Sequence, residues 1–213
     1  MIQKRPEYYT NPRDELYQFA GRAGLSLSGP VLNIGCGAGA DGPILRKFGA
    51  TEIHGVEPVG EAAQVARGEY DRVDACRLDE WTWDGTSYQL VVCADVLEHL
   101  ADPKQALLHI RSWLADDGRL LVSIPNVRHL SVLWMLLVRG DWRYEEAGIM
   151  DSTHLAFFTR RSFIRLLQET NYRITATTRW GTLGLTRRIE TYFPGSGEFL
   201  LSLIFFLASR GPR

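Results

Sequence analysis

Three closely spaced glycines are the first feature of the sequence that could take part in chemistry. Gly35, Gly37 and Gly39 directly follow a short apolar run at residues 30–34. Glycine lets the backbone turn sharply and approach a ligand that a Cβ atom would block. Glu57 lies 22 residues after the first glycine, at the end of a second apolar run, where a carboxylate can accept both hydroxyl hydrogens of a ribose. The turn and the acid together predict a site for a nucleotide cofactor.

A second group of reactive side chains follows the apolar run at residues 89–93. Asp95 lies three residues before Glu98 and four before His99, a spacing that would place all three side chains on one face of a helix. His154 lies in a later polar stretch. Because a histidine titrates near neutral pH, His99 and His154 are candidates for a general base that removes a hydroxyl proton.

The elements that must position these residues alternate along the chain. Apolar runs separated by segments of helical periodicity are typical of a largely parallel sheet that is covered by helices on both faces. The sequence therefore predicts an α/β fold with a doubly wound, mostly parallel, seven-stranded sheet. The predicted strands are residues 30–34, 52–56, 71–76, 89–93, 119–124, 173–178 and 203–208, and the predicted helices are residues 13–23, 39–48, 61–67, 103–114 and 160–169.

The domain organisation follows from this alternation. We interpret residues 1–213 as a single domain, because no composition shift or repeat divides the sequence. Residues 126–159 interrupt the alternation. We interpret them as an insertion of helix and loop that lies over the site as a lid and contacts the substrate.

Composition excludes several classes of protein. With 45% hydrophobic residues the chain can form a core, and its net charge of −1 gives no overall positive field to attract nucleic acid. We therefore expect no nucleic-acid partner. Cys36, Cys76 and Cys93 show no CxxC spacing, and the N-terminus lacks a signal-peptide pattern, which together predict a cytoplasmic protein.

Two apolar stretches, residues 130–138 and 199–208, are the candidates for membrane contact. Each has about half of the ~20 residues that a membrane-spanning helix needs, so the sequence predicts no transmembrane segment. We interpret the first stretch as core or as the wall of a pocket, since an apolar helical stripe usually faces inward. Peripheral contact with a membrane is the alternative.

Several stretches resemble motifs of the class I S-adenosylmethionine-dependent methyltransferases: VLNIGCGAG at 31–39, GVE at 55–57, VVCADVLEHL at 91–100 and residues 114–125. The resemblance extends over nearly the whole chain and implies a Rossmann-like fold with S-adenosylmethionine as the cofactor. GDWRY at 140–144 and DSTHLAFFT at 151–159 resemble, more narrowly, bacterial methyltransferases of glycan and lipopolysaccharide biosynthesis.

This resemblance implies roles for further residues in the cofactor site. Gly35, Gly37 and Gly39 would wrap the methionine part of the cofactor, and Glu57 would hold its ribose.

Other contacts are implied around this centre. Tyr9 and Arg13 match residues that close over the cofactor, and a guanidinium suits the methionine carboxylate. Asn33 stands where the family usually has an acid, and its amide oxygen can accept a hydrogen bond from the ammonium group. Leu78, through its backbone, and Ala94 complete the predicted cofactor site.

The polar group after residue 93 also resembles a metal-binding pattern. Asp95, Glu98 and His99 with the distant His154 are similar to the pattern of ubiquinone-type O-methyltransferases and of small-RNA 2′-O-methyltransferases. Such a set would suit Mg²⁺, Mn²⁺ or Zn²⁺, and the ion would bind a vicinal diol and lower the pKa of its hydroxyl groups. The alternative is that no metal is used, because similar motifs occur in class I methyltransferases without one.

The sequence thus predicts an S-adenosylmethionine-dependent O-methyltransferase that acts on a hydroxyl group of a sugar, a glycan or a glycosylated metabolite. One alternative is a ubiquinone-type O-methyltransferase of catechols or phenols. A non-catalytic regulatory module that binds the cofactor is another. A dehydrogenase is the third, because Gly35, Gly37 and Ala40 also satisfy the dinucleotide-binding fingerprint.

Overall fold

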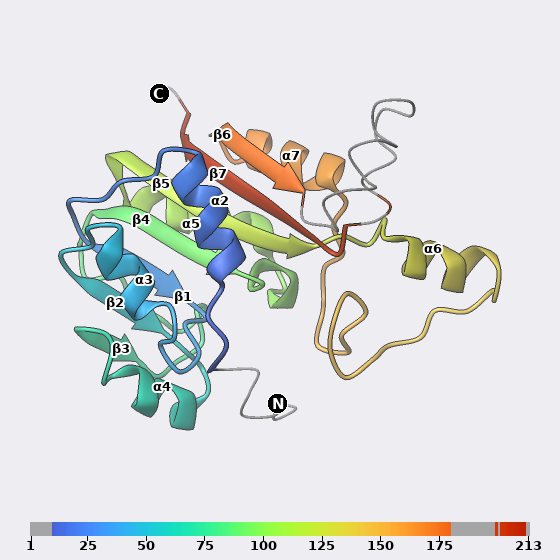
Figure 1. Cartoon of the computed structure of the whole chain (residues 1–213), viewed down its shortest axis with the longest axis horizontal. Helices are drawn as coiled ribbons and strands as arrows, with labels where there is room; N and C mark the ends of the chain where they lie inside the picture. The colour runs from blue at the N-terminus through green and yellow to red at the C-terminus, as the bar shows by residue number, and fades with distance from the viewer. Residues whose placement is uncertain (1–9, 180–198, 200, 212–213) are drawn as a thin grey trace.

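A seven-stranded sheet forms the centre of the computed structural model, which describes residues 10–179, 199 and 201–211 (Figure 1). The strand order is β3-β2-β1-β4-β5-β7-β6. The first five strands pair in parallel, whereas β7 pairs antiparallel with both β5 and β6. The strands are β1 (Val31–Ile34), β2 (Ile53–Val56), β3 (Arg72–Asp74), β4 (Tyr88–Ala94), β5 (Leu114–Pro125), β6 (Tyr172–Arg179) and β7 (Leu203–Arg210). The predicted mostly parallel, doubly wound sheet is confirmed.

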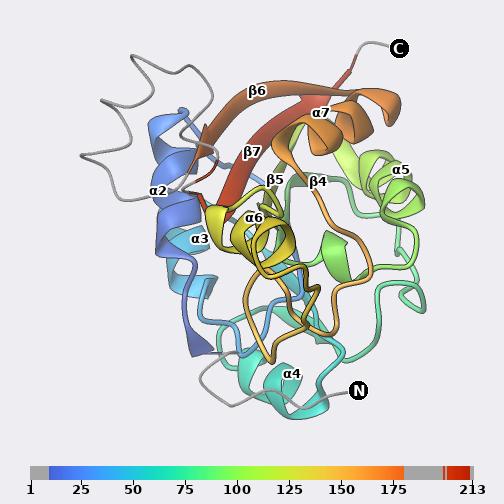
Figure 2. The same ribbon diagram turned by 90° about the vertical axis from the view of Figure 1, so that its right-hand side faces the viewer.

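Helices cover both faces of this sheet. Figure 2 shows α2 and α3 on one side and α5 and α7 on the other. Successive residues of β4 point to opposite faces: Val91 and Cys93 pack in the core cluster under α5 and α7, and Leu90 and Val92 pack in the cluster under α2, α3 and α4. The helices are α2 (Asp14–Arg22), α3 (Gly42–Lys47), α4 (Gly60–Ala66), α5 (Pro103–Trp113), α6 (Leu130–Leu137) and α7 (Arg160–Glu169), with one 3₁₀ turn, η1 (Leu97–His99).

The segment 126–159 leaves and rejoins the body of the protein at one place. The backbone N–H of Val127 donates to the carbonyl of Phe158 over 3.0 Å, and Asn126 forms a bridge with Phe158. Further along, the N–H groups of Leu155 and Ala156 both donate to the carbonyl of Glu98, over 2.8 and 3.0 Å. The segment is therefore attached to the body at its ends and, through Glu98, at the turn that follows β4.

The helix α6 is more exposed than we expected from its sequence. Val132 is its buried residue, whereas Leu130, Trp134 and Leu137, at helical spacing, are 51%, 54% and 76% exposed. The helix lies beyond the end of β5, where the sheet no longer continues beneath it (Figure 1). The interpretation of this stretch as core is wrong for that reason, although α6 does form one wall of a surface hollow of about 1190 Å³.

Length and hydropathy limit what the described helices can do in a lipid bilayer. Within residues 10–179, 199 and 201–211, none is long and apolar enough to cross a membrane. Peripheral contact through α6 stays a prediction.

The close packing of the glycine turn on α4 generates a stability prediction. Gly39 has a φ of +83°, and a Cβ there would lie 2.9 Å from the Cα of Ala66, at the end of α4. Gly24 has a similar φ of +77° with no atom within 4 Å of a Cβ. Gly24→Ala should lower the free energy of unfolding by about 1 kcal/mol through backbone strain alone. Gly39→Ala should lower it by a further ~1–3 kcal/mol, because the backbone of α4 must also move.

Urea unfolding of both variants measures this difference. An equal loss of stability in the two variants would mean that contact with α4 does not constrain residue 39.

Candidate active site

A cavity of about 380 Å³ lies at the carboxyl ends of β1, β2 and β4. The chain leaves β1 on one side toward β2 and returns on the other side to β4, so the loops after these strands diverge and leave a crevice between them. Residues from the turn after β1, the ends of β2 and β4, the loop after β3 and the segment 126–159 line it. The lining includes Asn11, Arg13, Gly35, Gly37, Asp41, Glu57, Leu78, Asp79, Ala94, Asp95, His99, Leu100, Thr153 and Leu155.

The turn after β1 requires glycine for two different reasons. Gly35 and Gly37 line the cavity with positive φ values of +67° and +55°. A Cβ on Gly35 would lie 2.6 Å from Cγ2 of Val96, in the segment after β4. Gly39 does not line the cavity, and its place is explained by the close approach to α4. The structure thus shows a packing role for Gly39, and its contact with the cofactor stays a prediction.

Glu57 lies at the end of β2, where the sequence predicts it, and lines the cavity. Its Oε2 accepts a hydrogen bond from the N–H of Gly37 and its Oε1 from the N–H of Val59, both over 2.9 Å. Burial raises the pKa of the Glu57 carboxyl, while these two N–H groups act in the opposite direction. The acid is thus held rigidly between the turn after β1 and the start of α4.

Arg13 and Asp95 form an ion pair at the cavity wall. Nη1 of Arg13 lies 2.8 Å from Oδ2 of Asp95, and the hydroxyl of Ser123 donates to Oδ1 of Asp95 over 2.6 Å. Asp95 has a φ of +55° and precedes η1, so the predicted helical face shared by Asp95, Glu98 and His99 does not form. Asp95 consequently lies apart from the group that Glu98 and His99 make with His154.

Asn33, which the sequence predicts to contact the cofactor, contacts Asp41 in the structure. Asn33 is 1% exposed and does not line the cavity. Its Nδ2 donates to Oδ2 of Asp41 over 3.3 Å and to the hydroxyl of Tyr70 over 2.7 Å. The residue at the cavity is Asp41, which sequence reasoning missed because it lies beyond the glycine motif. The direct contact of Asn33 with a cofactor stays a prediction.

The remaining predicted cofactor residues fall into two groups. Leu78 and Ala94 line the cavity. Beside Leu78, Arg77 and Asp79 form an ion pair of 2.9 Å on the exposed rim. Tyr9 lies outside the described residues.

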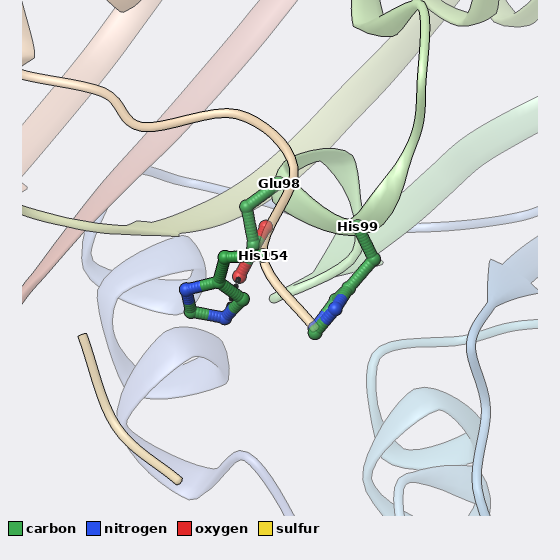
Figure 3. A group of neighbouring side chains, drawn as sticks. All are labelled: Glu98, His99 and His154. Atoms are coloured by element: carbon green, nitrogen blue, oxygen red, sulfur yellow. Dashed lines mark ion pairs between the residues drawn. The ribbon is translucent and has the colours of Figure 1, made fainter. Parts of the chain in front are cut away.

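Glu98, His99 and His154 form one cluster beside the cavity (Figure 3). One potential ligand atom from each residue lies within 4.8 Å of the others. Glu98 and His99 come from η1, and His154 comes from the segment 126–159, whose attachment to the carbonyl of Glu98 brings the two parts together. His99 lines the cavity itself, whereas Glu98 and His154 lie behind it.

Backbone carbonyls orient both imidazole rings. Nδ1 of His154 lies 3.0 Å from the carbonyl oxygen of Ile149. Nδ1 of His99 lies 3.3 Å from the carbonyl oxygen of Thr153 and 3.1 Å from its hydroxyl oxygen, whose hydrogen is donated to Oδ1 of Asp151. A carbonyl only accepts, so in both rings Nδ1 carries the hydrogen and Nε2 carries the lone pair. This is the arrangement in which a histidine can bind a metal or accept a proton through Nε2.

Glu98 is the unusual member of the cluster. It is 1% exposed, and neither carboxyl oxygen has a hydrogen-bond partner in the described part of the chain. Burial raises the pKa of this carboxyl well above its usual range, and the charge of Asp95 raises it further. A buried carboxyl without donors is unfavourable unless a cation or another donor joins it, and Nε2 of His154 lies 4.0 Å from its Oε1.

Comparison with known proteins identifies a family and relatives of this chain. A family model described as a methyltransferase domain matches residues 3–177. A ubiquinone biosynthesis O-methyltransferase from Aeromonas salmonicida is 28% identical over 144 residues, which cover 64% of this chain and 59% of that protein. The chain therefore spans less than two thirds of the length of this curated relative.

Solved structures agree on the fold. A SAM-dependent methyltransferase from Archaeoglobus fulgidus superposes with a TM-score of 0.69 at 16% identity, covering 96% of this chain and 97% of that one. The 1,6-didemethyltoxoflavin-N1-methyltransferase of Burkholderia thailandensis, solved with its substrate and S-adenosylhomocysteine, gives a TM-score of 0.62 at 18% identity, covering 94% and 78%.

These findings favour methyl transfer over the dehydrogenase alternative, because the family match includes the glycine turn, Glu57 and the cluster after β4. As the sequence predicts, the chain belongs to the methyltransferase domain family.

Proposed function

We propose that this chain is an S-adenosylmethionine-dependent O-methyltransferase whose acceptor is a catechol or phenol hydroxyl group. The observation that carries the proposal is the position of His99 on the wall of the cavity that begins at the glycine turn and Glu57, with Glu98 and His154 directly behind. The name of the Aeromonas salmonicida relative supports O-methylation in ubiquinone biosynthesis. This favours the catechol alternative over the glycan acceptor, which stays a prediction.

The cavity fits the cofactor in its chemistry. Apolar side chains such as Val56 and Leu78 suit the adenine ring, and the Glu57 carboxylate suits the two ribose hydroxyls. S-adenosylmethionine supplies, when bound, a methyl group made electrophilic by the positive sulfur. Because the transfer is an in-line displacement, the protein must hold the acceptor oxygen about 3 Å from that carbon.

The residues on the acceptor side can remove the hydroxyl proton and limit access of water. Without a metal, Nε2 of His99 carries the lone pair that would accept the proton, and the carbonyl and hydroxyl oxygens of Thr153 hold the ring in place. Leu100 and Leu155 add apolar surface to the same wall. His154, which does not reach the cavity, acts as a partner of Glu98 in this proposal.

A divalent metal completes the proposal. Glu98, His99 and His154 would hold it, because both imidazoles present Nε2 and the Glu98 oxygens lack donors within the described residues. The chemistry that such an ion would supply there is a lowered pKa of an acceptor hydroxyl group. The alternative without a metal leaves His99 as the general base and Glu98 as a buried neutral group.

The proposed function generates a prediction about the acceptor. With S-adenosylmethionine and Mn²⁺, we expect a catechol to be methylated at least ~10-fold faster than the matching phenol with one hydroxyl, because the neighbouring oxygen helps to position the reacting one. Release of S-adenosylhomocysteine and the mass of the product measure the two rates. Equal rates would contradict a role for the vicinal diol. Methylation of a sugar with no methylation of catechol would favour the glycan acceptor.

The proposed function also generates a prediction about the metal. Metal-stripped protein loaded with S-adenosylhomocysteine should bind one Mn²⁺ per chain in calorimetry. At 100 times the dissociation constant, the ion should raise the free energy of unfolding by about 2.7 kcal/mol. Glu98→Gln and His154→Ala should weaken this binding at least ~10-fold, because each removes a ligand.

His109→Ala provides the matched control, since it removes an exposed histidine on α5. Binding of Mn²⁺ that is unchanged in Glu98→Gln and His154→Ala would place the ion elsewhere. No binding by the loaded wild-type protein would leave His99 as a base that works without a metal.

A further inference from the structure

Asp41 is a buried carboxyl group at the cavity for which the sequence analysis assigns no role. It lies directly before α3 and is 7% exposed. The backbone N–H of Arg13 donates to its Oδ1 over 3.0 Å. The hydroxyl of Tyr17, over 3.0 Å, and Nδ2 of Asn33, over 3.3 Å, donate to its Oδ2. Two segments far apart in sequence thus hold one carboxyl group at the cavity wall.

The other carboxyl groups that line the cavity are engaged differently. Asp95 pairs with Arg13, and Asp79 pairs with Arg77 on the exposed rim. Glu57 is held by two N–H groups at the end of β2. Asp41 receives hydrogen bonds from neutral donors, and none of the ion pairs among the described residues includes it. Burial raises the pKa of this carboxyl, while the nearby charge of Arg13, which pairs with Asp95, acts in the opposite direction. The charge of Asp41 therefore suits a cation that arrives with a ligand.

The order of strands places these groups in sequence along the edge of the sheet. Leu78 follows β3, Glu57 follows β2, and Asp41 belongs to the turn after β1, while β3, β2 and β1 are neighbours in that order. A ligand whose base contacts Leu78 and whose ribose contacts Glu57 would extend its third part toward Asp41. In S-adenosylmethionine that part is an amino acid with a positively charged ammonium group.

We propose that Asp41 binds the ammonium group of the cofactor and replaces the acid that is absent at Asn33. Asn33 is then a positioning residue, because its amide donates to Asp41 and it does not line the cavity. The inference rests on the proposed function, since it names the subsite for one part of the proposed cofactor. The carboxyl group proposed for this contact belongs to the residue directly before α3, and its hydrogen bond with Asn33 links it to β1.

The test compares three ligands by calorimetry. S-adenosylhomocysteine carries the ammonium group, its deaminated analogue lacks only that group, and 5′-methylthioadenosine lacks the whole amino-acid part. Wild-type protein should bind S-adenosylhomocysteine about 10- to 100-fold more tightly than the deaminated analogue, in the range of a charged hydrogen bond. Asp41→Asn should bind these two ligands within about twofold of each other. Its affinity for 5′-methylthioadenosine should stay within about twofold of wild type.

The controls separate the inference from the proposed function. Binding of 5′-methylthioadenosine by Asp41→Asn shows that the variant is folded. If Asp41→Asn does not fold, the proposal is still tested by the ratio of the affinities for S-adenosylhomocysteine and its deaminated analogue. This ratio is measured in wild type and in Tyr17→Phe, which lacks one hydrogen-bond donor to Asp41. Asp14→Asn removes an exposed charge from α2 and should retain the full preference.

One result would contradict the inference about Asp41, and another would contradict the proposed cofactor. If wild-type protein binds S-adenosylhomocysteine but Asp41→Asn retains the preference for the ammonium group, the inference is wrong and the proposed function stands. If wild-type protein binds none of the three ligands, the proposed cofactor itself is wrong.

Discussion

The close approach of the Gly35 backbone to the side chain of Val96 constrains the whole site. No Cβ fits between them, so the turn after β1 and the segment after β4 are fixed against each other. On one side of this contact the turn directs the N–H of Gly37 to Glu57 and carries Asp41 to the cavity. On the other side the chain continues into η1, which presents Glu98 and His99. This contact thereby lies between the proposed cofactor side and the proposed acceptor side.

The segment 126–159 contributes geometry to the site through its backbone. Its N–H groups at Leu155 and Ala156 bind the carbonyl of Glu98, and its carbonyls at Ile149 and Thr153 orient the two imidazole rings. These contacts depend on the path of the chain and only weakly on side-chain identity. Side chains elsewhere in the segment are therefore free to vary with the acceptor while the cluster keeps its arrangement.

The sequence predicts the sheet well and the details of the site less well. The strands were predictable because apolar runs end at glycine, proline or charged residues, and Glu57 was predictable because its distance from the glycine turn follows from the fold. Asp41 was not, since its role depends on contacts with Tyr17 and Asn33 that only the tertiary structure forms. The spacing of Asp95 predicted a helix, but its positive φ breaks that face. The burial of α6 depended on whether any sheet remained beneath it, which periodicity does not reveal.

The position of β7 between β5 and β6 has a consequence for the synthesis of the protein. β5 pairs with β7 from Arg119 with Ser209 to Pro125 with Leu203, so the segment 126–159, α7 and β6 must all leave the ribosome before this pairing can form. Until then β5 presents one unpaired edge of an apolar strand, the kind of surface through which nascent chains associate. Translation speed through these intervening residues and access to chaperones thus bear directly on the yield of folded protein.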